Sequence, residues 1–242
     1  MAPNSDNRSA FFGKYPGIVV DNQPPEGASK FQGDIKVKVS FILDETASPI
    51  ELWAKPCFHP GFFFIPEVGD NVWVEFVAGN IDFPVWSGVW YPQGKTPQTS
   101  DGQAPVTENK VIRTPSGHVL ELDDKGEKVV LLDKNNNKVT LDASGIVITD
   151  TNQNQITLDT SGVKIADKSG NEAVMDATGV TVKSQAIKLG EAAVEPLVLG
   201  NQFLTLFNTH MHIGNLGAPT SPPAAAGTPA LPTHLSLKNR TE

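Results

Sequence analysis

A 17-residue period in the second half of the chain constrains the fold more than any other feature of this sequence. Cut at that interval, residues 129–179 give three versions of one segment: VVLLDKNNNKVTLDASG, IVITDTNQNQITLDTSG and VKIADKSGNEAVMDATG. The aligned aspartates and glycines are Asp133, Asp150 and Asp167, then Asp142, Asp159 and Asp176, then Gly145, Gly162 and Gly179. A fixed period of this kind indicates stacked copies of one small structural unit.

The alternation pattern in each repeat unit predicts two short β-strands joined by turns. Apolar residues alternate with polar ones, as expected of strands with one buried face. The aligned apolar positions are Val129, Ile146 and Val163, then Leu131, Ile148 and Ile165, then Val139, Ile156 and Ala173, then Leu141, Leu158 and Met175. Asn and Gly occupy the turns, where positive φ angles are needed. Turn formation explains the aligned aspartates better than calcium binding does.

The repeats place only about four side chains in seventeen on the inner face. A single-chain β-solenoid needs roughly 20 residues per coil to enclose its own core, and repeat units generally bury their faces against neighbours. A lone column of these units would leave an apolar stripe exposed. Three copies around one axis would give the same positions a continuous dry core. We therefore predict an intertwined homotrimer, with a single-chain solenoid as the alternative.

Residues 11–92 contain all four tryptophans and clear alternation of apolar and polar residues. In DIKVKVSFIL, one face carries Ile35, Val37, Val39 and Phe41. The segment NVWVEFV alternates in the same way. With YPGIVV and PVWSGVWYP, these segments make about five short strands separated by Pro, Gly and Asp turns. We predict a small closed or nearly closed β-barrel.

The remaining boundaries follow changes in composition. Residues 1–10 are a polar arm, residues 93–110 a linker rich in Gly, Pro, Gln and Thr, residues 111–190 the repeat region and residues 191–242 a Pro- and Ala-rich tail. The tail holds one short apolar segment, PLVLGNQFLTLFNTHMH. The sequence therefore predicts an all-β protein in which a barrel, a linker, a repeat rod and a short C-terminal region follow one another.

Charge and cysteine content exclude several classes of function. The net charge is −8 and no basic block exists, which argues against a binder of nucleic acid or anionic membranes. The one cysteine, Cys57, excludes an intrachain disulfide and is expected to be a small buried residue. The N-terminus lacks the apolar core of a signal peptide, and no stretch approaches the ~20 apolar residues that span a bilayer. We expect synthesis in a cytosol.

Three stretches carry a resemblance to a known family. Residues 65–91, IPEVGDNVWVEFVAGNIDFPVWSGVWY, contain a P-x-x-G-D turn followed by a strand, and a later P-V-W-x-G strand. The repeats are the second stretch, and residues 199–223, LGNQFLTLFNTHMHIGNLGAPTSPP, are the third. Together they resemble the central spike proteins of contractile injection machines, namely the phage baseplate assembly protein V group and its relatives in type VI secretion.

This resemblance implies both a fold and a role. Residues 11–92 would be an OB-fold barrel that acts as a collar, residues 111–190 a triple-stranded β-helix, and residues 191–242 a metal-binding apex. The protein would be a spike in a virion tail baseplate, or in a phage-tail-like injection particle, and would puncture the target cell envelope when the sheath contracts. Expected partners are tube or hub and baseplate proteins, the target envelope and, where the tip is covered, a separate capping protein.

His210 and His212 are the candidate metal ligands. In an extended segment, residues two apart point to the same side. One chain would offer two imidazoles, and three chains would offer six nitrogens in an octahedral set. Iron suits that set, and the resemblance implies it at the apex as one ion per trimer. Zinc, which usually takes four ligands, is the alternative ion. Two solvated histidines in a tail are the plainer alternative.

Other functions fit the sequence less well. Some members of the family insert a cell-wall lysozyme between barrel and rod, but the 18 residues of the linker are too few for a domain. A metal-dependent amidohydrolase would need further His and Asp ligands after the H-x-H pair. The sequence after His212 contains one histidine, His234, and no aspartate. We therefore predict no enzyme. The barrel lacks the cationic groove that single-stranded nucleic acid requires. The main alternative is a non-penetrating trimeric receptor-binding tail fibre, which would need a bulky C-terminal head.

Overall fold

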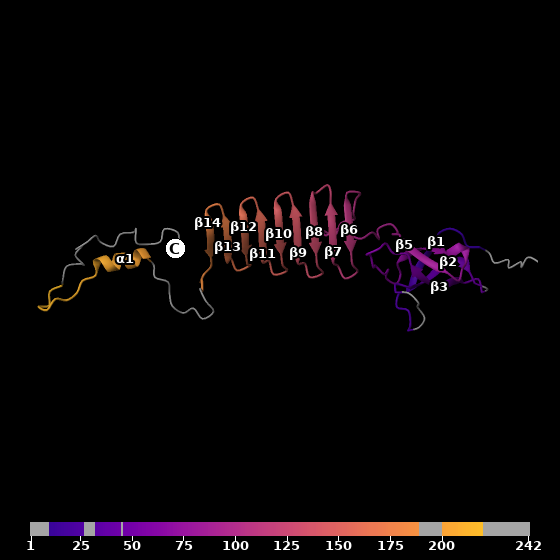
Figure 1. Cartoon of the computed structure of the whole chain (residues 1–242), viewed down its shortest axis with the longest axis horizontal. Helices are drawn as coiled ribbons and strands as arrows, with labels where there is room; N and C mark the ends of the chain where they lie inside the picture. Colours follow the sequence, from indigo (N-terminus) through magenta and orange to yellow (C-terminus); the bar gives the residue numbers. More distant parts are fainter. Residues whose placement is uncertain (1–9, 27–31, 45, 189–199, 220–242) are drawn as a thin grey trace, which may run out of the picture. The chain divides into compact units, whose positions relative to one another are not determined.

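The structure, a computed structural model, describes residues 10–26, 32–44, 46–188 and 200–219. Most of the predicted polar arm and the tail beyond Pro219 lie outside the described residues. In those four ranges the chain forms fourteen β-strands, one short 3-10 helix and one α-helix (Figure 1). The prediction of an all-β protein is confirmed except for the single α-helix.

Five strands close the N-terminal barrel. They are β1 (Tyr15–Asp21), β2 (Ile35–Leu43), β3 (Pro49–Pro56), β4 (Asn71–Phe76) and β5 (Pro84–Val89), and the 3-10 helix η1 (Val77–Gly79) follows β4. The strand order is β1-β2-β3-β5-β4, with β3 and β5 parallel and β4 pairing back onto β1. The predicted closed barrel is confirmed. The alternation of apolar and polar residues did not reveal the strand β3, because Ala54 is its only buried residue.

The barrel core consists of the side chains of these strands that point into the barrel. Its buried members are Val19, Ile35, Val37, Val39, Ile42, Ala54, Val72, Val74, Phe76 and Trp86. The indole N–H of Trp86 donates a hydrogen bond of 3.0 Å to the carbonyl oxygen of Gly33, so its polar group is satisfied in the apolar interior. The sequence pattern thus identified most of this core.

Two barrel residues lie opposite to their predicted side. Phe41 is 74% exposed and Ile42 takes the core position, because a bulge between Val39 and Leu43 shifts the alternation of β2 by one residue. Cys57 is exposed rather than buried, since it follows the end of β3, where the chain leaves the barrel wall.

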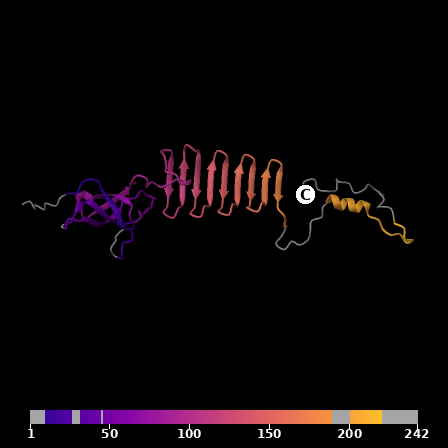
Figure 2. The ribbon, with the colours of Figure 1, turned by 180° about the vertical axis from the view of Figure 1, so that it is seen from behind.

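The repeat region forms one nine-stranded antiparallel sheet. Its strands are β6 (Asn109–Arg113), β7 (Val119–Asp123), β8 (Lys128–Leu132), β9 (Lys138–Asp142), β10 (Gly145–Thr149), β11 (Gln155–Asp159), β12 (Gly162–Ala166), β13 (Glu172–Asp176) and β14 (Gly179–Lys183). The spatial order from β6 to β14 equals the sequence order, as both faces of the ribbon show (Figures 1 and 2). Each 17-residue unit supplies two strands, as predicted.

Strand pairing in this sheet is within one chain. The strand β9 ends at Asp142 and β10 begins at Gly145, so only two residues join them. A connection that short forms a tight hairpin and holds consecutive strands side by side. Within the chain, consecutive strands therefore pair as an antiparallel meander, and the expected intertwining of three chains stays a prediction.

The segment predicted as a polar linker contains an ordered turn that packs on the sheet. The backbone N–H of Thr99 donates to the carbonyl oxygen of Gln103 at 2.9 Å, and Thr99 is buried. The N–H of Ser100 donates to Oε2 of Glu121 at 2.7 Å, and the Arg113 guanidinium donates to the carbonyl oxygen of Thr99 at 3.2 Å. The turn therefore covers part of the sheet near β6 and β7.

A helix occupies the C-terminal region where extended chain was expected. The helix α1 (Gly200–Thr209) belongs to the second of two compact units into which the chain divides. Its apolar residues recur at helical spacing in GNQFLTLFNT, which the strand-centred prediction overlooked. None of the helices in the four described ranges is long and apolar enough to cross a membrane.

Candidate functional site

The nine-stranded sheet carries two apolar rows on one face. Directly paired residues on neighbouring strands share a face. The pairing aligns the first row as Ile112, Leu120, Leu131, Val139, Ile148, Ile156 and Ile165. It aligns the second row as Leu122, Val129, Leu141, Ile146, Leu158 and Val163. We call this surface the apolar face. The predicted inner positions from Val129 to Ile165 all lie on it.

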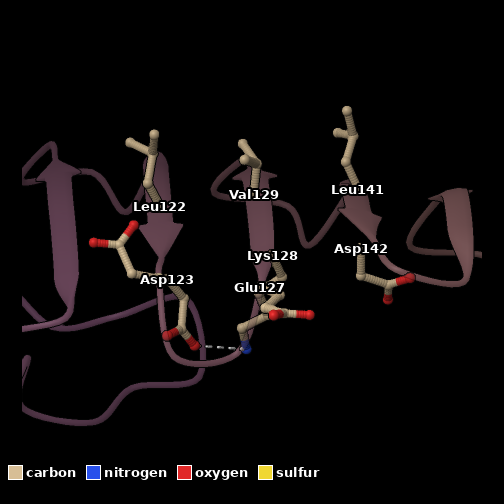
Figure 3. Close-up of a pocket in the computed structure, with 8 residues that line it drawn as sticks. Leu122, Asp123, Glu127, Lys128, Val129, Leu141 and Asp142 are labelled. Carbon is tan, nitrogen blue, oxygen red and sulfur yellow. Dashed lines mark ion pairs between the residues drawn. The ribbon is translucent and has the colours of Figure 1, made fainter.

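Much of the apolar face is open in the single chain. Leu131, Leu141, Ile148, Leu158 and Ile165 are 38–56% exposed. The side chains of Leu122, Val129 and Leu141 extend from three neighbouring strands to the same side of the sheet (Figure 3). Soluble proteins rarely leave a contiguous apolar patch of this extent exposed, and such patches mark interaction surfaces. A single-chain solenoid would have enclosed these side chains, so the sheet does not support that alternative.

The opposite face of the sheet has a different character. Its central row runs through Val130, Thr140, Val147, Thr157 and Lys164. Near its start, the ordered turn of the linker covers the sheet, and Val119, Glu121 and Val130 are fully buried there. The opposite face is therefore more polar and is partly covered by its own chain. This difference indicates that the apolar face is the one that meets a partner.

The aligned aspartates cap the turns of the sheet. Oδ1 of Asp133 accepts the backbone N–H groups of Asn135 and Asn137, both at 2.8 Å, and its Oδ2 accepts the Asn137 amide at 2.7 Å. Asp150 repeats this arrangement with Asn152 and Asn154 one unit later. Hydrogen bonds from the side chain and backbone of Asn137 hold the pKa of Asp133 below its ordinary value. The carboxylates thus make turns, as predicted.

The histidine pair lies just beyond α1. Nδ1 of His210 lies 2.6 Å from the carbonyl oxygen of Phe207. Because a carbonyl oxygen only accepts, this Nδ1 carries the proton, and Nε2 of the neutral ring keeps the lone pair that a metal requires. The ring centroid of His212 lies 5.1 Å from that of His210. The two candidate ligands are therefore neighbours, although the end of a helix, and not strand spacing, positions the first of them.

One chain supplies an incomplete metal site. In the part of the chain that the structure describes, no group of three or more His, Cys, Asp or Glu residues lies together. The donor chemistry of His210 and His212 fits an imidazole-binding ion such as iron or zinc, but two ligands hold either ion weakly. A complete coordination shell requires further ligands, which additional copies of the same pair would provide.

The barrel carries an aromatic patch that the alternation pattern missed. Phe62, Phe63 and Phe64 lie in the segment between β3 and β4, and all three are exposed. The ring centroids of Phe62 and Phe64 are 6.0 Å apart. The run of three consecutive phenylalanines was the available signal in the sequence, but it lies outside the alternating segments on which the barrel prediction rested.

Two family models match the chain. The type VI secretion system/phage-baseplate injector OB domain matches residues 15–91, and the phage baseplate V C-terminal trimerisation domain matches residues 109–167. Together they span more than half of the sequence. No curated protein matches the chain significantly.

The closed five-stranded barrel and most of the repeat sheet thus lie in segments that two injector-baseplate domain models match, the second of them a trimerisation domain. The chain belongs to the phage-baseplate spike protein family. The matched trimerisation domain contains β6 to β12, so it includes both rows of the apolar face. The family is structural, and it locates the protein at the baseplate of a phage or of a secretion system.

Proposed function

We propose that the protein is the homotrimeric central spike of a contractile injector and that it punctures the target cell envelope. Three sheets pack their apolar faces around one axis to form a triangular shaft, so each chain supplies one wall. The open apolar face, located within a matched trimerisation domain, carries this proposal. In this shaft the four apolar positions of each repeat unit are shared among three chains, as the composition of the repeat requires.

Burial of the apolar face supplies the energy of assembly. Complete burial of a Leu or Ile side chain contributes about 1.5–3 kcal/mol. The exposed half of such a side chain therefore contributes about 1 kcal/mol when a partner covers it. Each sheet has five large side chains in this state between β8 and β12 alone. Because three chains contribute, the sum is large enough to hold a trimer together without any disulfide.

The mass of the purified protein tests the trimer. Three copies of the 25.9 kDa chain give about 78 kDa. Leu158→Asp places three carboxylates at the shared interface and should abolish trimers. The matched control is Thr157→Asp, one residue away on the opposite face, which should leave the mass unchanged. A well-folded wild-type monomer, or equal behaviour of the two variants, would overturn the proposal.

The puncturing role rests on the mechanical character of the shaft. In the nine-stranded ladder each strand is hydrogen-bonded to its neighbours, so a load along the stack passes through every strand-to-strand interface in turn, and the three walls packed on one core would share it. The barrel joins the tube or hub and the baseplate, and the exposed phenylalanines 62–64 are the surface that we assign to this contact. Force from sheath contraction then acts on the shaft and drives its end through the envelope.

A comparison with the receptor-binding fibre alternative tests the puncturing role. Particles carrying a chain truncated after Lys188 should adsorb to target cells normally but permeabilise them at least tenfold less. The purified trimer should not compete with particles for adsorption. Competition by the purified trimer, or loss of adsorption in the truncated particles, would instead identify a receptor-binding fibre.

At the apex, His210 and His212 of three chains would together hold one iron ion. The ion would supply a structural cross-link among the three chains. Elemental analysis should give one metal per three chains in the wild type. The double variant His210→Ala, His212→Ala should contain none and should remain trimeric. One metal per chain, or metal retained in the double variant, would contradict this assignment, and zinc in place of iron would correct the ion.

A further inference from the structure

The helix α1 presents an apolar face that nothing in the described residues of its own chain covers. Phe203, Leu206 and Phe207 are exposed, Leu206 by 67%, and no residue of α1 is buried. At 100° per residue, Phe203, Phe207 and His210 lie within an arc of about 60°. Thr205 and Asn201 lie on the other side of the helix. The helix is therefore amphipathic, with the first candidate metal ligand at the end of its apolar stripe.

The stripe is organised as a stack of rings. The rings of Phe203 and Phe207 are stacked with centroids 6.1 Å apart, and the centroid of the His210 ring lies 5.5 Å from that of Phe207. The Nδ1–H of His210 donates to the Phe207 carbonyl oxygen, which ties the imidazole to the last turn. The orientation of α1 thus sets the direction of the His210 ring.

A helix of this length needs a partner. In water, isolated helices shorter than about 12–15 residues are marginal, and most helical stability in proteins comes from packing of an apolar face. The ten residues of α1 bury none of their side chains within the described chain. The helix can therefore persist only where another surface covers Phe203, Leu206 and Phe207.

The geometry points to two further copies of α1 as that surface, in a parallel three-helix cluster that aims three His210 side chains at the trimer axis. This inference rests on the homotrimer of the proposed function. Apolar side chains are also exposed beyond the matched trimerisation domain, at Val180 and Val182 of β14 and at Ile187. Only residues 189–199 separate the last of these segments from α1. Three chains joined in the sheet would hold three copies of α1 at high effective concentration.

In this arrangement Phe203 and Phe207 are positioning residues for the metal ligands. Packing of their rings between the three helices fixes the rotation of each α1 about its axis. That rotation brings each His210 inward, and its bonded Nδ1 leaves Nε2 to face the shared centre. The histidine pair thereby becomes a preorganised site, and the three chain ends need no ordering when the ion binds.

A cysteine scan of α1 in the full-length chain tests the cluster. In a Cys57→Ser background, single cysteines replace Phe203, Leu206 or Phe207 on the apolar side and Asn201 or Thr205 on the polar side. Three thiols near one axis can form one disulfide and leave one thiol free. Mild oxidation with diamide should therefore convert up to two of every three chains to dimers at the apolar positions, and at least fivefold fewer at the polar positions.

The outcomes separate this inference from the proposed function. Equal cross-linking on both sides of the helix, or none at any position, in a protein whose mass remains trimeric, would overturn the cluster and leave the trimer intact. A monomeric mass would overturn the proposed function itself.

A metal titration tests the positioning role. At limiting iron, Phe203→Ser with Phe207→Ser should bind at least fivefold less metal per trimer than the wild type. The matched control, Asn201→Ser with Thr205→Ser, should bind as the wild type does. Wild-type metal content in the phenylalanine variant would show that the histidines need no support from α1.

Discussion

At the residue scale, the repeated glycines of the sheet are required by close approach of a neighbouring strand. Gly145 and Gly162 adopt φ angles of 140° and 135°. A Cβ atom at Gly145 would lie 2.0 Å from the carbonyl oxygen of Leu158, and one at Gly162 equally close to that of Met175. Backbone atoms of a paired strand cannot move aside as a flexible side chain can. The recurrence of glycine every 17 residues therefore reflects close contact between the backbones of paired strands.

Gly145→Ala should destabilise the sheet by about 2 kcal/mol or more per chain, because the new methyl group displaces β11 and strains the backbone. The matched control is Gly170→Asn. Gly170 has φ +86° and open space around it, and the aligned Asn136 and Gln153 also have positive φ. Chemical denaturation of the two variants gives the comparison. Equal denaturation midpoints would show that the close approach is relieved at little cost.

The turn aspartates make the sheet sensitive to acid. Backbone hydrogen bonds from Asn154 lower the pKa of Asp150, and the Thr178 side chain lowers that of Asp176. Because the folded pKa lies below the unfolded one, the stabilisation is complete above the unfolded value of about 3.9 and is lost as the pH falls through the folded pKa. The thermal midpoint of the rod should be constant from pH 7 to 5 and decrease below pH 4. Asp150→Asn should reduce that decrease, and an unchanged midpoint at pH 3 would contradict this account.

At the scale of elements, the turn at residues 98–103 is attached to the sheet through one buried carboxylate. Glu121 is 1% exposed, and its oxygens accept the N–H of Ser100 at 2.7 Å and the side-chain amide of Asn109 at 3.4 Å. Lys128 adds an ion pair of 3.1 Å to Asp101 in the same turn, although Asp101 is more than half exposed and this pair contributes little. The linker is thus fastened to the outer wall of the rod.

Glu121→Leu should release this turn. It removes the acceptor of two hydrogen bonds from half-buried donors, and a hydrogen bond to a charged group contributes about 1.5–3 kcal/mol. Limited proteolysis should then cut between residues 93 and 105, a segment in which we expect the wild type to resist cleavage. Glu121→Gln keeps an acceptor oxygen and should remain largely protected. Equal protease resistance of Glu121→Leu and the wild type would show that the turn is held by other contacts.

At the scale of the whole molecule, the boundary between collar and rod lies N-terminal to the ordered turn. A fragment beginning at Lys95 should form trimers and melt at a higher temperature than the barrel fragment 10–92. A fragment beginning at Val106 should also form trimers but melt several degrees lower, because it exposes Val119 and Val130. Solution mass and thermal melting of the three fragments test this order. Loss of trimers in the Lys95 fragment would mean that the barrel drives assembly.

Local patterns in the sequence determined much of the fold. Alternation of period two identified four of the five barrel strands and the strands of the three 17-residue units, β8 to β13, because each side chain of a strand alternates between faces regardless of distant residues. The 17-residue period placed both apolar rows on one face, and Asp and Gly marked the turns. These features depend on neighbours a few residues apart, so the sequence alone carries them.

Only the tertiary structure decided the features that depend on distant contacts. The bulge of β2 turned Phe41 outward, and pairing with β2 on one side and with β5 on the other made a strand of β3, which has no alternation. The helix α1 replaced an extended apex and set the direction of His210. In each case the deciding interaction joins residues far apart in the chain, or selects between local structures that the same apolar spacing permits.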